Sequence, residues 1–126
     1  MSRARFYLTE TAFRQLDDII YKTALDHGPD QAEKYKQQQI AGFETIAQEH
    51  ETLRTAHREA LAKDTPFRVH RVEHHYVVYQ SHDAFNVIIV GILHERMDIP
   101  TRLRELQSLS RHEIDVLRRE IDRSRT

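Results

Sequence analysis

The chain of 126 residues contains no cysteine and no tryptophan, and it has only three glycines and three prolines. Without cysteine, disulfide bonds and thiolate metal sites are excluded, and a reducing compartment is compatible with the sequence. So little glycine and proline argues against a disordered chain or one dominated by loops. We therefore expect a folded protein stabilised by an apolar core rather than by cross-links.

Long apolar stretches are also absent. The first eight residues include no apolar segment of the kind that marks a signal peptide. No run of the sequence reaches the roughly 18 apolar residues that a membrane-spanning helix needs. We expect a cytoplasmic protein that makes no contact with a membrane.

The charge is nearly balanced, with 19 Lys and Arg against 20 Asp and Glu and a net charge of −1 at pH 7. Proteins that bind nucleic acid by themselves usually carry a clear basic excess, because neutralisation of phosphates supplies most of their affinity. Direct binding of nucleic acid is therefore not expected.

The first half of the chain predicts one short strand followed by a helical hairpin. Residues 5–8 alternate between polar and apolar, as in a strand. Thr9 is a suitable N-cap for a first helix, and the Gly-Pro pair at 28–29 ends that helix. Asp30 and Glu33 form a capping-box-like start for a second helix. Apolar residues recur at helical spacing in both segments: Ala12, Phe13, Leu16, Ile19, Ile20 and Ala24, then Ala32, Tyr35, Ile40, Phe43, Ile46 and Ala47.

Residues 66–98 predict three consecutive strands, around which the rest of the chain is organised. The last strand, Phe85 to Leu93, is apolar at almost every position. A strand of this kind is usually covered on both faces, so we expect it to lie centrally in the sheet. Short turns between the three strands favour antiparallel pairing.

The regions on either side of the strands give weaker signals. Residues 51–64 predict a loop with some helix. Asp98 is expected to cap a following helix, with Met97 packed beneath it, and Ser110 with Glu113 forms a capping box for a last helix. A narrow apolar seam follows these helices: Leu103, Leu106, Ile114, Leu117 and Ile121. Such a seam packs on the rest of the chain or pairs with another chain, and the sequence leaves both interpretations open.

These elements predict an α+β fold with the order β-α-α-β-β-β, followed by a C-terminal helix extension. The helical hairpin is expected to cover one face of a mostly antiparallel sheet.

Several cationic and histidine side chains in the strand region have the chemistry of RNA cleavage, which needs a base, an acid and cations on the phosphate. Arg68, His70 and His74 would point to the same side of one strand. The other candidates are Arg71, His75, Tyr79, His94 and Arg96. The alternative interpretation is that these side chains are ordinary polar surface.

A metal site or a cofactor site is not predicted. His70 and His74 would lie about 13 Å apart on an extended strand, too far to share one ion. The sequence also lacks a zinc-protease motif, a phosphate-binding loop and a serine flanked by glycines.

The end of the last strand carries the most specific motif of the chain, Ile92-Leu93-His94-Glu95-Arg96-Met97-Asp98. Further matches are Phe6-Tyr7-Leu8-Thr9, Arg68, and His75 before Tyr76-Val77-Val78-Tyr79. On these residues the chain resembles the RelE/ParE superfamily, and within it the ParE branch. The resemblance covers roughly residues 5–107. We therefore divide the chain into a RelE/ParE-like domain, residues 1–107, and a C-terminal helical extension, residues 108–126.

The resemblance implies the toxin component of a type II toxin–antitoxin system, neutralised by an antitoxin translated from the same operon. Members of the ParE branch inhibit DNA gyrase through protein–protein contact. On this hypothesis the residues expected to bind the target are Arg68, His75, Tyr79, His94 and Arg96. Those expected to bind the antitoxin are Leu103, Leu106, Ile114, Leu117 and Ile121.

Two alternatives stay open. RelE-like members cut messenger RNA on the ribosome, and the catalytic candidates would then be Arg68, His70, His74 and His75. A family member could also have lost toxicity and bind only its antitoxin. The fold does not choose between these functions, and both a homodimer and a toxin–antitoxin hetero-oligomer are compatible with the sequence.

Overall fold

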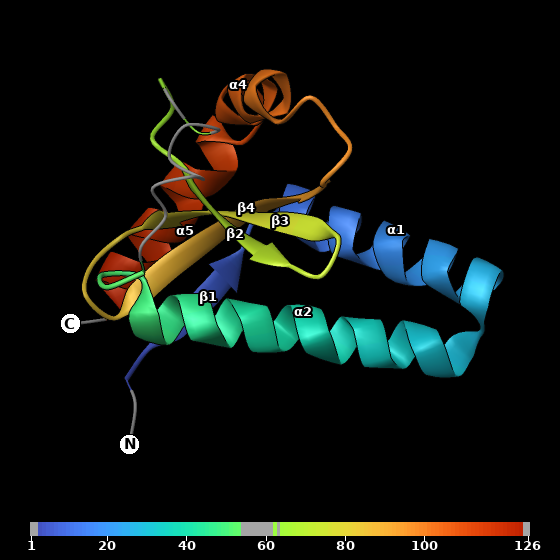
Figure 1. Cartoon of the computed structure of the whole chain (residues 1–126). Helices are drawn as coiled ribbons and strands as arrows, with labels where there is room; N and C mark the ends of the chain where they lie inside the picture. Colours follow the sequence, from blue (N-terminus) through green and yellow to red (C-terminus); the bar gives the residue numbers. More distant parts are fainter. Residues whose placement is uncertain (1–2, 54–61, 63, 125–126) are drawn as a thin grey trace.

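The computed structural model describes residues 3–53, 62 and 64–124. Its strands are β1 (Arg5–Leu8), β2 (Arg68–Val72), β3 (His75–Ser81) and β4 (Asn86–His94). Its helices are α1 (Glu10–His27), α2 (Pro29–Glu49), α4 (Ile99–Leu109) and α5 (Arg111–Arg123). This arrangement, drawn in Figure 1, confirms the predicted α+β class and the order of the elements. Most of the predicted loop at 51–64 lies outside the described residues.

The four strands form one sheet in the order β1-β4-β3-β2. β4 is antiparallel to β3 and parallel to β1, and β2 is antiparallel to β3. Seven successive residues of β4, from Val87 to Leu93, are buried. The prediction of a central last strand is therefore confirmed, because β4 has a strand on each side and helices on each face.

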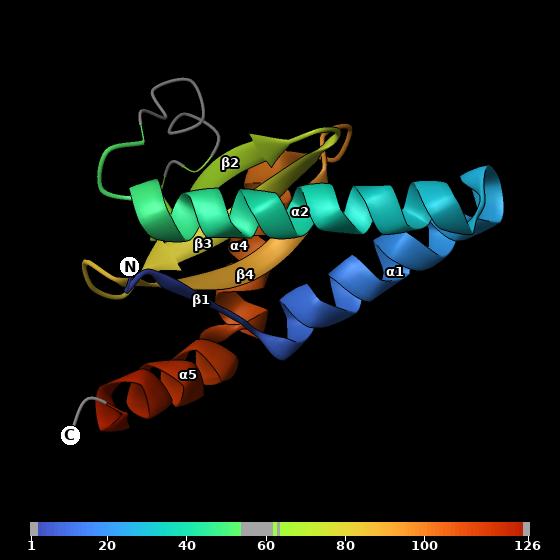
Figure 2. The ribbon, with the colours of Figure 1, turned by 90° about the horizontal axis from the view of Figure 1, so that it is seen from below.

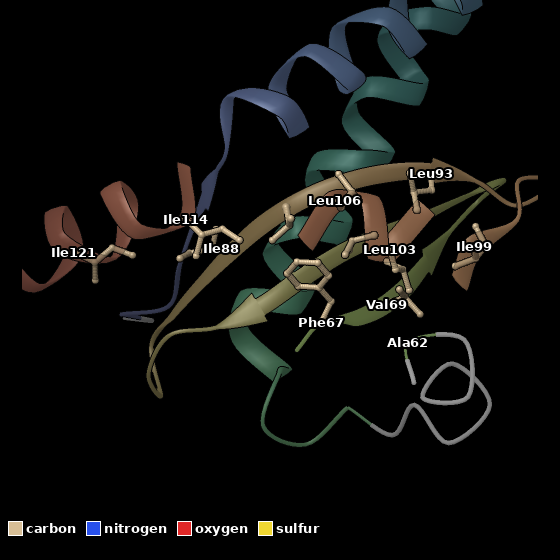
Figure 3. Packing of buried hydrophobic residues seen from close by; sticks show 12 residues of the cluster. Ala62, Phe67, Val69, Ile88, Leu93, Ile99, Leu103, Leu106, Ile114 and Ile121 are labelled. Atoms are coloured by element: carbon tan, nitrogen blue, oxygen red, sulfur yellow. The ribbon is translucent and has the colours of Figure 1, made fainter. Parts of the chain in front are cut away.

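Helices cover both faces of the sheet, as Figures 1 and 2 show. α1 and α2 pack on one face, where Phe43 and Ile46 lie in one core with Val77 and Ile89. α4 and α5 cover the other face, and Figure 3 shows their apolar side chains directed at the sheet. The turn between α1 and α2 projects beyond the sheet in both views.

The junction between α1 and α2 is one residue long. Gly28 ends α1 with a φ of +91°, a backbone conformation that glycine adopts without strain, and its N–H donates to the Ala24 carbonyl. α2 then begins at Pro29, whose missing N–H costs nothing at the first helical position. The predicted end of α1 is confirmed, whereas the predicted start of α2 at Asp30 is wrong, because Gly28 also serves as the N-cap of α2.

The predicted helix caps were only partly right. Thr9 caps α1 and Asp98 caps α4, each through its side chain. Ser110, in contrast, makes no capping hydrogen bond from its side chain. The Glu113 carboxylate instead accepts hydrogen bonds from the backbone N–H and the hydroxyl of Thr11, both at 2.8 Å. A carboxylate at the N-terminus of α1 is favoured by the helix dipole, so the C-terminal extension is tied to the first helix of the chain.

β4 extends past the end of β1. Beyond that point, side chains that follow β1 in the chain form hydrogen bonds with the backbone of β4 in place of a neighbouring strand. Thr9 donates its hydroxyl to the Val90 carbonyl at 3.2 Å, and Gln15 accepts the Ile92 N–H at 2.8 Å. A Cβ at Gly91 would lie 2.8 Å from a methyl carbon of Leu106, so a larger residue there would force that side chain to shift. On the edge that β1 leaves free, this part of β4 therefore faces α1, whereas its other edge pairs with β3.

Within the described ranges, no helix combines the length and the apolarity that crossing a membrane requires.

Candidate functional site

The structure separates the candidate residues into two ends of the sheet and its core. We call the end formed by the β2–β3 turn and the last residue of β4 the histidine end; it contains His74, His75, His94 and Glu95. We call the opposite end, where β2 begins and β3 stops, the serine end; it contains Arg68 and Ser81. β2 alone spans about 13 Å from Arg68 to Val72, and His74 lies beyond it in the β2–β3 turn. Arg68, His70 and His74 therefore do not converge on one reacting atom.

The centre of the histidine end is a ring cluster around His75. His75 and His94 are paired in the β3–β4 register, and their ring centroids lie 5.0 Å apart in an edge-to-face arrangement. On its other side, His75 Nδ1 lies 2.5 Å from the Tyr35 hydroxyl of α2. The two contacts fix the imidazole between the sheet and the helical hairpin.

The protonation states in this cluster follow from burial. Burial, and then the charges of His94 and His74, lower the pKa of His75 from 6.5 to about 4. Burial also raises the pKa of Tyr35 above its usual value. At neutral pH the tyrosine therefore keeps its proton and His75 is uncharged, and one hydrogen bond joins the two side chains.

A charged rim surrounds the cluster. Glu95 accepts a hydrogen bond from His74 Nδ1 at 3.1 Å and forms an ion pair with Arg71 at 2.5 Å. The hydrogen bond from His74 is the main cause that lowers the pKa of Glu95, and the Arg71 charge lowers it further. These contacts join the β2–β3 turn to the end of β4. Beyond the rim, the Arg96 side chain is exposed.

A cleft of about 670 Å³ opens beside the histidine end, between the two helices of the hairpin. Its walls combine apolar and charged side chains: Ile19, Ile92 and Met97, with the cationic Lys22 and Lys34 and the acidic Asp18, Asp26 and Glu73. Across residues 3–53, 62 and 64–124, no three or more His, Asp or Glu side chains are grouped so that they could hold a metal ion.

At the serine end, Arg68 donates from Nη1 to the His50 carbonyl at 3.3 Å. His50 lies at the end of α2 and is 2% exposed. Its Nδ1 lies 2.6 Å from Ser81 Oγ, and its Nε2 lies 3.0 Å from the Ala84 carbonyl oxygen. His50 and Ser81 were not predicted as a pair from the sequence, because they are 31 positions apart and neither lies in a recognisable motif.

Other candidate residues are buried in the core. Tyr79 is fully buried, and His70 is half-buried on β2. Of the apolar seam, Leu103, Leu106, Ile114 and Ile121 are buried against the sheet and Leu117 packs beside them. The seam thus packs within the chain, the first of its two interpretations. A contact of these residues with an antitoxin stays a prediction, and it would require α4 or α5 to move.

Comparisons with known proteins agree with this geometry. Residues 6–99 match a family model described as the ParE toxin of the type II toxin–antitoxin system parDE. The fold is also similar to a solved structure titled as the chromosomal ParDE TA system from P. aeruginosa, with a TM-score of 0.60 and 17% sequence identity. That similarity covers 73% of this chain and 96% of the other. A search of curated proteins gave no match.

Proposed function

Because this chain belongs to the ParE toxin family of type II toxin–antitoxin systems, we propose that it inhibits DNA gyrase by direct protein–protein contact and is neutralised by a cognate antitoxin. The observation that carries the proposal is the family match, which runs from β1 to the start of α4. The activity would then be one of binding, with no bond made or broken by the toxin.

We propose that the gyrase contact lies at the histidine end. Arg96 and His74 are exposed there, and His94 is half-buried beside them. The Tyr35–His75 contact and the Arg71–Glu95 ion pair hold this surface rigid, which lowers the entropy lost on binding. Arginine is also enriched among residues that dominate interface energies.

We propose further that the antitoxin inserts a segment into the cleft beside the histidine end and covers this surface. Ile19, Ile92 and Met97 would suit the apolar face of an amphipathic segment. Its charged groups would meet both Lys22 and Lys34 and the acidic Asp18, Asp26 and Glu73. The ribonuclease alternative finds less support, since its candidates Arg68 and His74 lie at the serine end and the histidine end of the sheet.

The test is growth of bacteria after induced expression of the chain without antitoxin. Growth arrest is expected, with induction of the DNA-damage response, and co-expression of the antitoxin from the same operon should restore growth. The Arg96→Glu variant is expected to weaken inhibition about tenfold, because it reverses a charge at the proposed contact.

The matched control is Arg119→Glu, which reverses an exposed charge on α5 and should leave toxicity unchanged. Equal toxicity of the two variants would show that the histidine end is not part of the contact with gyrase. Harmless expression of the unaltered chain would contradict the proposed function itself.

A further inference from the structure

The serine end contains a serine–histidine pair that the proposed gyrase contact does not use. Ser81 Oγ lies 2.6 Å from His50 Nδ1, a normal distance for a hydrogen bond from a hydroxyl. The Ser81 side chain is exposed, whereas the His50 side chain is buried behind it. An exposed serine therefore contacts an imidazole that is buried from solvent.

The second nitrogen of His50 determines which way the first hydrogen bond runs. The Ala84 carbonyl oxygen can only accept, so His50 Nε2 carries the proton in this contact. In the neutral imidazole, Nδ1 is then unprotonated and accepts from the Ser81 hydroxyl. This is the arrangement in which a histidine acts as the base for a serine nucleophile, with the carbonyl orienting the ring.

The turn that provides the Ala84 carbonyl is itself held in place. Asp83 Oδ1 accepts from the N–H groups of Phe85 at 2.8 Å and Asn86 at 3.0 Å. His50 is anchored from the other side, since Arg68 donates to its carbonyl. The imidazole is thus fixed between α2 and the β3–β4 turn.

Arg68 indicates the kind of group that this pair would accept. It is paired with Tyr79 in the β2–β3 register, so its side chain emerges on the same face as Ser81, two residues further along β3. A guanidinium on the same face as a nucleophile suits phosphoryl oxygens, which it can bind through two parallel hydrogen bonds.

From this geometry we propose that Ser81 is an activated nucleophile that accepts a phosphoryl group, with His50 as its base and Arg68 as the partner of the phosphoryl oxygens. The donor in this step is a phosphoanhydride, and a lone pair of Ser81 Oγ forms the new O–P bond as the bond from phosphorus to the bridging anhydride oxygen breaks. The leaving group departs with the bonding electrons, and the hydroxyl proton moves to His50 Nδ1. Ser81 would thereby be a covalent modification site on the toxin.

The test uses the full chain and a fluorophosphonate, a phosphoryl electrophile whose leaving group is fluoride. Adducts are counted by intact mass spectrometry and located by peptide mapping. We expect one adduct, on Ser81, formed about 100-fold faster than any at Ser108, an exposed serine of α4 that serves as the control within the same molecule. Equal labelling of the two serines would overturn the proposal.

Two variants distinguish a role of His50 as the base from a purely structural role in hydrogen bonding. Gln at position 50 can keep both hydrogen bonds but cannot take the proton, so His50→Gln should slow labelling about 100-fold with little change in the unfolding midpoint. Labelling of His50→Gln at the original rate would contradict the proposal. Arg68→Met is expected to slow labelling about tenfold. An unchanged rate would show that Arg68 does not bind the phosphoryl oxygens. If His50→Gln does not fold, the ratio of the labelling rates of Ser81 and Ser108 in the unaltered chain decides whether the proposal stands.

Discussion

Replacement of Leu103 by alanine is expected to lower the free energy of unfolding by about 3 to 4 kcal/mol, the usual cost of removing a fully buried leucine side chain. Leu103 is 0% exposed and lies in the core between α4 and the sheet, with Val69, Val78 and Val90. The surrounding strands are fixed by their pairing, so they can collapse only partly into the cavity. The loss follows from the lost burial and from the cavity that remains.

The measurement is urea unfolding of the variant beside Leu109→Ala. Both leucines belong to α4, but Leu109 is 71% exposed, so its loss should change the free energy of unfolding by no more than about 0.5 kcal/mol. If Leu103→Ala cost as little as Leu109→Ala, α4 would not be packed on the sheet in the free chain. The apolar seam would then be available to an antitoxin.

Acidification from pH 7 to pH 4 is expected to remove about 3 kcal/mol of stability through His75 alone. The pKa of His75 is about 4 in the folded chain and 6.5 in the unfolded chain. Between these values the unfolded chain binds the extra proton, so acid favours unfolding. This contribution is fully present above pH 6.5, falls as the pH drops through this range, and is lost below pH 4.

The variant His75→Gln tests this assignment, because glutamine can still form a hydrogen bond with Tyr35 but does not titrate. Its free energy of unfolding, measured at several pH values, should vary less between pH 6.5 and 4 than that of the unaltered chain. His112→Gln, an exposed histidine of α5, should keep the original pH dependence. The same slope in His75→Gln as in the unaltered chain would show that the acid sensitivity arises elsewhere.

Elements with local signals were predictable from the sequence. The Thr9 cap, the Gly-Pro pair at 28–29 and the apolar run of the last strand each specify structure within a few residues, and all three are confirmed. The pair Ser110 and Glu113 has an equally good local signal, yet Glu113 binds Thr11, 102 residues away. A local pattern contains no information about a competing partner brought in by tertiary structure.

The candidate site could likewise be predicted only where local patterns were sufficient. His75 and His94 were found because they flank recognisable strands, and the structure brings them together. Tyr35 reads as one more apolar position on α2, although its hydroxyl is what orients His75. The contact between His50 and Ser81 depends on how α2 crosses the sheet, which no spacing in the sequence expresses.

The most direct test of the central claim is a supercoiling assay with purified gyrase and the purified chain. We expect the chain to block supercoiling, the Arg96→Glu variant to do so about tenfold less effectively, and added antitoxin to restore gyrase activity. Normal supercoiling in an excess of the chain, when the same chain arrests growth in cells, would contradict gyrase as the target. Messenger RNA on the ribosome would then be the next substrate to examine.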